Sequence, residues 1–283
     1  MIVDVVQRWR SRSASYRPAG EVIDTRAYEV APITDDTTAR TFVVREHYSG
    51  TYPAARRRFG LYRRAELAGV AVFSVPARDE VLRPLPGGRD TACDLGRLVL
   101  LDHVPANGET WFVSRCRELL AREGFEGCVM FSDPHPRTTR GGEVVFAGHI
   151  GTIYQGLGAV ALDRSHPDTV YLLDDGRSFP RRTLDKIRTR DRGWRYAVAQ
   201  LVESGAPAPT DDDLAAWLAR VLPLHTRKVR HPGNLKYVLP FTAAAKRAVR
   251  AAVGEGRPYP KLCDVGLCLG ARQHRPTCDR RAA

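Results

Sequence analysis

The sequence predicts an α/β (α+β) fold: a mixed, strongly twisted central sheet flanked by helices and followed by a basic C-terminal extension. Between residues 22 and 173, short apolar runs bounded by turn formers alternate with amphipathic segments of helical period. After residue 173 the chain becomes more basic and less regular. A hydrophobic share of 43% and a charged share of 27% are normal for a globular protein.

Four segments are expected along the 283 residues. Residues 1–20 are polar and basic, which is typical of a flexible arm. Residues 21–173 form the catalytic core, whose length is normal for one domain. Residues 174–261 form a basic extension that contacts nucleic acid, and residues 262–283 form a tail with cysteines and a histidine.

The core is expected to open with a strand over residues 22–30. A polar Thr-Asp-Asp run then caps a helix over residues 37–46. A second helix over residues 111–123 is amphipathic and is capped by Asn107 or Thr110. Apolar runs predict the remaining strands, over residues 67–73, 95–101, 128–131, 159–162 and 170–173.

The extension has fewer regular elements. Residues 204–210 form a linker rich in proline and alanine, and residues 211–222 form a short amphipathic helix with an acidic start. Residues 234–240 alternate in the manner of an edge strand.

The charge balance favours an anionic partner, because the net charge is +12 and most of the basic residues are arginines. Nucleic acid fits this balance, although a GC-rich genome also enriches arginine, alanine and glycine. No apolar run has the length of a membrane span, and the N-terminus lacks an apolar signal region. We therefore expect no membrane partner and a cytoplasmic location.

Two stretches are candidates for DNA contact. Residues 51–64 interleave aromatic residues with arginines, which suits stacking and phosphate pairing. The alternative is a solvated loop whose aromatic residues turn inward. The basic extension supplies the second stretch. The candidate DNA-binding residues are Arg56, Arg57, Arg58, Arg63, Arg188, Arg190, Arg227, Lys228 and Lys236.

Reactive side chains gather in residues 127–159. Asp133 follows the predicted strand over residues 128–131, at the end where open α/β sheets usually place their chemistry. His149, Gly151 and Tyr154 follow within a few residues of one another. The alternative reading is a turn with a capping aspartate and a packed tyrosine.

The cysteines divide into two sets. Three lie singly in apolar segments and are expected to be buried: Cys93, Cys116 and Cys128. The tail contains C-x4-C-x5-H-x3-C, formed by Cys263, Cys268, His274 and Cys278. Four soft ligands at short spacing can close a tetrahedral zinc site. The alternative is a disordered tail with incidental cysteines.

An ordered series of motifs resembles the phage Mom proteins across roughly residues 28 to 261. The motifs are HYS at 47–49, RLVL at 97–100, PANGET at 105–110, FSDP at 131–134, GHIGTIYQ at 148–155 and KYVLP at 236–240. The resemblance implies a fold similar to the GNAT acyltransferases. It also implies conversion of the N6 amine of adenine in DNA to an N6-carbamoylmethyl group, which protects phage DNA from restriction in the host cytoplasm.

This chain departs from the family pattern at three places, which bear on the target sequence and the donor. Residues 136–147 separate the Asp-Pro pair from the Gly-His-x-Gly run, which are nearly adjacent in the family. Thr110 stands where the family has serine, and Gly-Leu-Gly at 156–158 replaces a turn that contains alanine.

Adenine N6 is a weak nucleophile that is paired inside duplex DNA, so we expect the base to be flipped into a pocket. The candidate catalytic residues follow from this chemistry. Asp133 would accept the proton, and Tyr154 would donate to a leaving group or orient the donor. The other candidate catalytic residues are Ser132, His149, His47 and Tyr48. The family resemblance also suggests iron, held by His47, Tyr48 and Asp133.

The donor is expected to be an acyl or aminoacyl compound, carried as acyl-CoA or on tRNA. Candidate cofactor-binding residues are Asn107, Thr110, Gly151 and Thr152. A GNAT enzyme holds the CoA pyrophosphate on a glycine-rich loop before a helix, but residues 104–110 contain only one glycine. An aminoacyl ester that supplies a glycine unit fits this loop better.

Two other functions stay open at this point. A conventional GNAT-type N-acetyltransferase would use acetyl-CoA on a protein or small-molecule amine and would not bind DNA. A non-catalytic nucleic-acid-binding protein would act through its zinc tail. The basic charge fits the DNA-modifying enzyme and the non-catalytic binding protein equally well.

Overall fold

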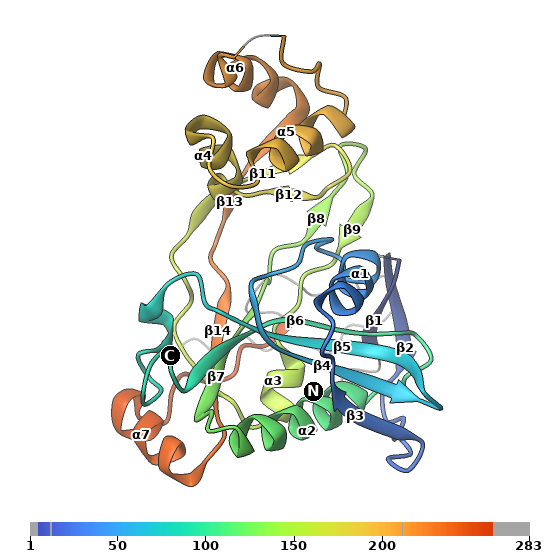
Figure 1. Ribbon diagram of the computed structural model, residues 1–283, viewed down its shortest axis with the longest axis vertical. Coiled ribbons are helices and arrows are strands. Elements are labelled where there is room, and N and C mark those ends of the chain that lie inside the picture. The colour runs from blue at the N-terminus through green and yellow to red at the C-terminus, as the bar shows by residue number, and fades with distance from the viewer. Residues whose placement is uncertain (1–4, 12, 211, 263–283) are drawn as a thin grey trace, which may run out of the picture.

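A seven-stranded mixed sheet forms the centre of the protein (Figure 1). We describe it from a computed structural model, which covers residues 5–11, 13–210 and 212–262. The strand order is β10-β14-β7-β6-β5-β4-β3. The bounds are β3 Tyr28–Pro32, β4 Ala55–Arg63, β5 Glu66–Ser74, β6 Ala92–Leu100, β7 Gly127–Ser132, β10 Val160–Ala161 and β14 Leu235–Pro240. All neighbours are antiparallel except β6 and β7, and the mixed α/β class is confirmed.

Helices cover both faces of this sheet. Alternate residues of β5 point to opposite faces. Val70 and Val72 pack with α1, whereas Ala71 and Phe73 belong to the larger core with α2. Burial of Phe112, Cys116 and Leu120 on one side of α2 bears out its predicted amphipathic pattern. The bounds are α1 Asp36–Glu46, α2 Gly108–Arg122, α3 Thr152–Gly156, α7 Ala243–Val253 and the short 3-10 turn η1 Asp79–Leu82.

The N-terminal segment is more regular than its composition suggests. We expected a flexible arm, but β1 (Val5–Arg10) and β2 (Ser13–Pro18) form an antiparallel hairpin. Arg8 explains its position, because its buried guanidinium pairs with Glu109 at the start of α2 and donates to the Pro105 carbonyl at 2.6 Å. The hairpin is thereby attached to the core.

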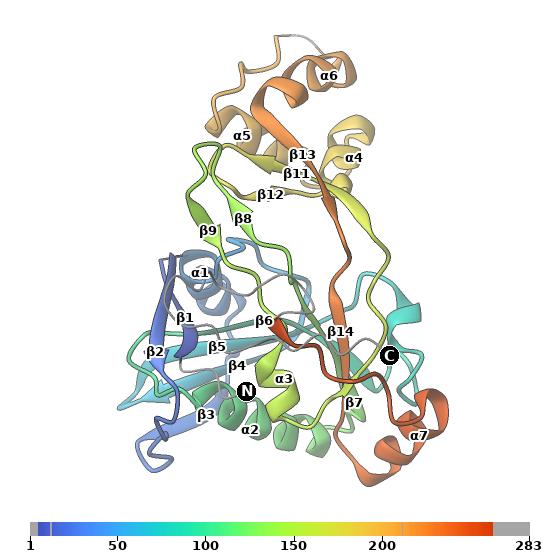
Figure 2. The same ribbon diagram turned by 180° about the vertical axis from the view of Figure 1, so that it is seen from behind.

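A separate helical lobe, defined here as residues 168–231, lies at the opposite end of the molecule from α7 (Figures 1 and 2). Its three-stranded sheet consists of β12 (Ser178–Phe179), β11 (Asp168–Leu173) and β13 (Thr226–His231). Its helices are α4 Arg181–Thr189, α5 Trp194–Glu203 and α6 Leu214–His225. They share their own apolar core, which contains Phe179, Leu201 and Trp217.

Several predicted elements need correction. The first strand of the sheet is β3, not residues 22–30. Most of residues 51–64, for which a solvated loop was the alternative to DNA contact, forms the strand β4. Residues 235–240 are not an edge strand, because β14 pairs with β7 on one side and with β10 on the other. The basic extension therefore completes the central sheet with β14 and covers it with α7. Within the described residues, no helix is long and apolar enough to cross a membrane.

Candidate functional site

The two parallel strands at the centre of the sheet, β6 and β7, separate along their length, and we call the place where they separate the fork. They pair only from Ala92–Gly127 to Asp94–Val129. Beyond that point β6 continues to Leu100 and β7 to Ser132, and the two strands no longer pair. Asp133 follows β7 directly, as the sequence predicted. Beyond the last pair, the ends of β6 and β7 are not hydrogen-bonded to each other, and residues from other segments lie between them.

The inserted residues 136–147 leave the sheet and return to it. They form β8 (Arg137–Thr138) and β9 (Val144–Phe146), a hairpin that extends toward the helical lobe (Figure 1). The chain then comes back beside β7, where the His149 amide donates to the Asp133 carbonyl at 2.8 Å. The insertion therefore leaves Asp133 and His149 side by side.

Asp133 is the centre of a buried polar network. One carboxylate oxygen accepts from His231 Nε2 and from the His135 amide, both at 2.9 Å, and the other accepts from Arg137. Burial raises the pKa of Asp133, but the hydrogen bond from His231 and the Arg137 charge outweigh it and hold the pKa well below its usual range. Asp133 is therefore a fixed anion with both oxygens engaged, which suits positioning better than proton transfer.

An aromatic stack lies next to this network. The Tyr48 ring stacks between His47, at a centroid distance of 4.2 Å, and Phe146, at 4.5 Å. The Arg137 guanidinium lies 4.8 Å from the Phe146 ring centroid. His149 meets the edge of Phe146 at 6.0 Å. His47 is 6% and Phe146 2% exposed, so these rings pack on one another and on Arg137 directly beside the polar network.

The two histidines of this cluster are neutral. Burial, reinforced by the charge of Arg97, lowers the pKa of His47 well below its usual value of 6.5. Burial also lowers the pKa of His149, to about 4, against the opposing charge of Asp133. His47 Nδ1 accepts from the Ser49 amide at 3.1 Å, which places the ring proton on Nε2.

Tyr154 and Gly151 close the fork from the side of α3. The Tyr154 hydroxyl donates to the Phe131 carbonyl at 3.3 Å. Burial first, and then Tyr48 and Asp94, raise the pKa of Tyr154 far above its usual value, so the phenol stays neutral and acts as a donor. Gly151 has φ +71, and a Cβ there would lie 2.6 Å from the Tyr154 ring. Ser132 is also buried here, whereas Thr152 is exposed.

Sequence reasoning missed two charged residues on β6. Asp94 stands where the strands diverge, and burial raises its pKa to about 7 although Arg97 opposes the shift. Arg97 donates to the Thr51 carbonyl at 3.0 Å and to the Thr51 hydroxyl at 2.6 Å. A carboxylate that titrates near neutral pH suits a general base. Its only sequence signal was an acid within an apolar strand.

The loop expected to hold the donor is occupied by the N-terminal segment. Asn107 precedes α2 but does not cap it, and its side-chain oxygen accepts from the Ile23 amide at 2.7 Å. Thr110 donates to the Asn107 carbonyl at 2.9 Å. The Ala106 amide of this loop donates to the Glu21 carboxylate at 3.2 Å. These residues hold the protein together rather than cradle a phosphate.

The residues expected to bind iron do not fit a metal. His47 and Tyr48 are stacked on one another, and both oxygens of Asp133 are taken by positively polarised donors. Among the described residues, no group of three His, Cys, Asp or Glu side chains could hold an ion. The proposed zinc ligands Cys263, Cys268, His274 and Cys278 lie outside the described residues.

The three single cysteines are buried, as expected: Cys93, Cys116 and Cys128. Burial raises the pKa of each thiol, to about 12 for Cys93. These side chains are therefore uncharged parts of the core.

The candidate DNA-binding arginines on β4 have partners within the protein. Arg56 donates to the Ala92 carbonyl at 2.7 Å, and Arg58 pairs with Asp36 at 2.7 Å. Arg57 pairs with Glu123, and Arg63 lies over the Tyr28 ring at 5.7 Å. This stretch is part of the sheet, so its arginines are not a row of free charges.

The candidate DNA-binding residues of the basic extension lie in different surroundings. Arg188 pairs with Asp185 at 3.1 Å and Arg190 with Asp212 at 3.3 Å, on the exposed side of the helical lobe. Arg227 connects the lobe to the β8 carbonyl of Thr138. Lys228 is exposed.

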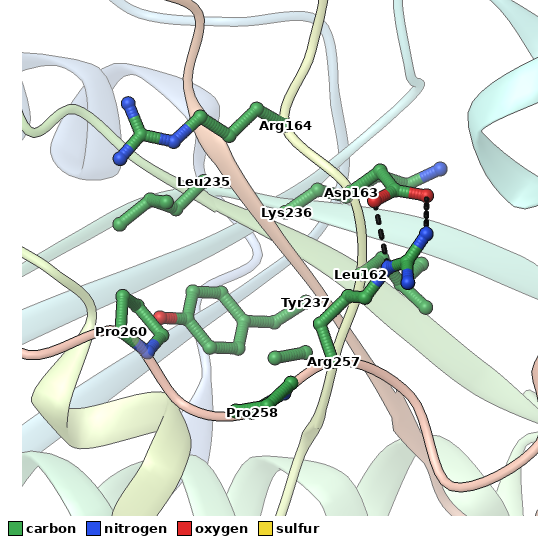
Figure 3. Close-up of a pocket in the computed structure, with 10 residues that line it drawn as sticks. Leu162, Asp163, Arg164, Leu235, Lys236, Tyr237, Arg257, Pro258 and Pro260 are labelled. Carbon is green, nitrogen blue, oxygen red and sulfur yellow. Dashed lines mark hydrogen bonds and ion pairs between the residues drawn. The ribbon is translucent and has the colours of Figure 1, made fainter. Parts of the chain in front are cut away.

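Lys236 lines a separate hollow near the β10–β14 edge (Figure 3). Burial lowers the pKa of its ammonium group. The hollow has a volume of about 260 Å³ and is also lined by Tyr237, Arg164 and the Asp163–Arg257 ion pair. Lys236 is thus half-buried and lies apart from the exposed arginines of the lobe.

The sheet, its parallel fork and the polar cluster beside that fork define a mixed α/β protein with a candidate site at its two parallel strands. A family comparison makes this more specific: the chain belongs to the Mom protein family, whose model matches residues 27–261. No curated protein matches the chain.

Two solved structures are similar to this chain at low sequence identity. A tandem GNAT protein from the clavulanic acid biosynthesis pathway, determined without acetyl-CoA, is 8% identical with a TM-score of 0.42, over 76% of this chain and 99% of that chain. A Bacillus subtilis acetyltransferase in complex with CoA is 10% identical with a TM-score of 0.32, over 75% of this chain and 97% of that chain.

Proposed function

We propose that this protein is a Mom-type DNA-modifying transferase, which converts the N6 amine of adenine in double-stranded DNA to an N6-carbamoylmethyl group. The observation that carries the proposal is the family match over residues 27–261. The cluster at the fork supports it independently, because it combines stacked aromatic rings, a guanidinium and neutral hydrogen-bonding groups.

In this proposal, the target adenine is flipped out of the duplex toward the stack of His47, Tyr48 and Phe146. Arg137 lies beside the stack and holds Asp133 through a salt bridge. A base that approaches Phe146 therefore meets an oriented guanidinium and a fixed carboxylate. His149 and Tyr154, both uncharged, supply hydrogen bonds to the base or to the donor.

The transfer step needs a proton acceptor. One N–H bond of the amine breaks, a bond forms between N6 and the incoming carbon, and the donor's leaving group departs with the bonding electrons. Asp133 was the candidate from the sequence, but its low pKa makes it a weak base. We assign proton acceptance to Asp94, whose pKa of about 7 suits the task, and a positioning role to Asp133.

The donor is proposed to be an aminoacyl ester rather than acyl-CoA. Attack of N6 on the ester carbonyl carbon breaks the ester C–O bond, releases the donor's hydroxyl group and gives a glycyl amide. An isomerisation that moves N6 from the carbonyl carbon to the methylene carbon, and the amino group from the methylene to the carbonyl carbon, then gives the carbamoylmethyl group with no gain or loss of atoms. The Ala106 amide donates to Glu21 and the Gly108 amide donates to the Pro105 carbonyl, so these two amides of the loop before α2 are not free to bind a phosphate. This observation disfavours an acetyl-CoA enzyme. Glycine label found in the added group, and not only in the purine ring, would support the ester, and acetate label in that group would contradict it.

Mass spectrometry of nucleosides tests the proposal. Plasmid DNA from cells that express the protein is digested and compared with DNA from cells that express Asp94→Asn. A glycyl group and a carbamoylmethyl group have the same elemental composition, so mass alone cannot separate them. Alkaline hydrolysis does, because it cleaves a glycyl amide and leaves an N6–CH2 bond intact. Unmodified nucleosides from well-folded protein would refute the proposal.

A further inference from the structure

Two helices of the helical lobe form a helix–turn–helix pair. Helices α4 and α5 are joined by only four residues, 190–193. Two of these residues adopt the left-handed backbone conformation. Arg190, at φ +56, ends α4, and Gly193, at φ +90, precedes α5. Short connections with glycine are typical of the pairs that place a helix in the DNA major groove.

This pair is strongly basic. Residues 177–195 contain eight arginines or lysines and two aspartates. Arg181, Arg182, Arg192 and Arg195 are all exposed. Because salt bridges take up only some of the guanidinium groups of this region, the surface keeps a net positive charge that suits a phosphate backbone.

Aromatic side chains stand among these arginines at the start of α5. Arg195 lies 4.8 Å and Arg190 5.9 Å from the Trp194 ring centroid, so the turn and the helix are joined by cation–π contacts. Tyr196 is 60% exposed, which is unusual for a large aromatic residue. An exposed tyrosine next to Arg195 offers a flat, amphipathic contact surface.

The lobe is a folded unit that is connected directly to the candidate site. Its own core includes Leu184, Leu201 and Trp217. Strand β13 leaves the lobe and ends at His231, which donates to Asp133. A ligand held by the lobe is therefore fixed relative to the polar network at the fork.

We propose that the helical lobe is a docking module for duplex DNA, with the arginine and aromatic surface of α4, the turn and the start of α5 in the major groove. The choice of DNA rests on the proposed function. The major groove of B-form DNA admits a helix, whereas that of A-form RNA is too narrow. In this proposal the lobe binds the DNA duplex beside the flipped base, and the residues at the fork carry out the transfer.

The test uses the full-length protein and two matched double variants. Arg192→Gln with Arg195→Gln removes two exposed charges from the lobe. Lys246→Gln with Arg247→Gln removes two exposed charges from α7, at the opposite end of the molecule (Figure 2). Fluorescence anisotropy with a labelled DNA duplex gives Kd across a series of salt concentrations, and circular dichroism checks that both variants are folded.

The lobe variant is expected to weaken binding about tenfold and to lower the salt slope, log Kd against log salt, by about 2. The α7 variant keeps both values. An unlabelled RNA duplex of the same length is expected to compete poorly. If the lobe variant binds as the α7 variant does, or if duplex RNA competes as well as DNA, the docking proposal is wrong.

The modified nucleoside is measured in the same strains, which separates the two proposals. If the unaltered protein leaves adenine unmodified while the lobe variant still loses binding, the docking module stands and the proposed reaction fails. If adenine is modified and the lobe variant binds normally, the reaction stands and the docking module fails.

Discussion

At the scale of one residue, the burial of Asp94 affects both the stability of the protein and the proposed proton transfer. Its pKa is about 7 instead of 3.8, because burial opposes the charged form. Between those values the folded protein keeps a proton that the unfolded chain has lost, so the contribution of Asp94 to stability falls as pH rises from about 4 to about 7. Asp94→Asn should remove this fall and raise the melting temperature by a few degrees at about pH 8.

The same substitution tests the assigned base. Modification by the unaltered protein should rise with pH up to about 7, and Asp94→Asn should lose at least about a hundredfold in rate. Glu80→Gln, which changes an exposed acid, is the control. If Asp94→Asn keeps the rate and the pH profile, Asp94 is not the proton acceptor.

Gly151 shows a second constraint at a single residue. Gly151 and Gly158 have nearly the same φ, +71 and +70, but a Cβ at Gly158 meets nothing within 4 Å. Gly158→Ala should cost about 1 kcal/mol, from the left-handed backbone alone. Gly151→Ala should cost more, because its methyl group collides with the Tyr154 ring and with Tyr237. Urea denaturation compares them, and equal costs would show that the ring contact has no effect.

The N-terminal hairpin provides the prediction at the scale of an element. Arg8 is buried against Glu109, and burial raises the pKa of Glu109 to about 7 even though Arg8 opposes the shift. Arg8→Ala leaves a buried acid unpaired and should cost about 3–5 kcal/mol, measured by urea denaturation. Replacing both residues together, by Arg8→Met and Glu109→Leu, should recover most of that loss. A single variant of unaltered stability would contradict this account of the hairpin.

The elements that the sequence predicted well have a pattern of apolar residues that is visible within the element itself. Strand β5 is an apolar run from Leu67 to Phe73, β6 is apolar apart from Asp94, Gly96 and Arg97, and α2 has a clear helical period. The hairpin β1–β2 was missed because it is polar, and one buried guanidinium anchors it to α2. The interior position of β14 was missed because its partners β7 and β10 lie far away in the sequence.

In the candidate site, too, some residues could be predicted from the sequence and others could not. Asp133 was found from its position after a strand, and His149 and Tyr154 were found from their spacing. His231 was missed because it lies 98 residues from Asp133 and follows no motif. Asn107 and Thr110 have residue types that suit an anion loop, but Ile23 takes up the Asn107 side chain and Thr110 binds within the loop. Only the folded chain reveals such partners.

At the scale of the whole molecule, the helical lobe has an apolar core of its own, separate from the three apolar clusters of the central sheet and its helices in the described residues. The central sheet holds the fork with the polar cluster, and the helical lobe holds the basic surface. The connections between them are narrow: β13 leads from the lobe to His231, and Arg227 and Arg140 join the lobe to the β8–β9 hairpin. Separate cores with few cross-contacts favour separate unfolding units.

Trp217→Ala tests whether the lobe unfolds on its own. Trp217 is 1% exposed, and its ring nitrogen donates to the Pro207 carbonyl at 2.8 Å. Loss of the ring should cost the lobe about 3–5 kcal/mol. In hydrogen exchange, amides of α4, α5 and α6 should lose protection while those of β5 and β6 keep it. Phe59→Ala, in the central core, should instead expose the sheet. If Trp217→Ala lowers protection equally in both regions, the protein is one cooperative unit, and the lobe cannot hold DNA as a body with its own stability.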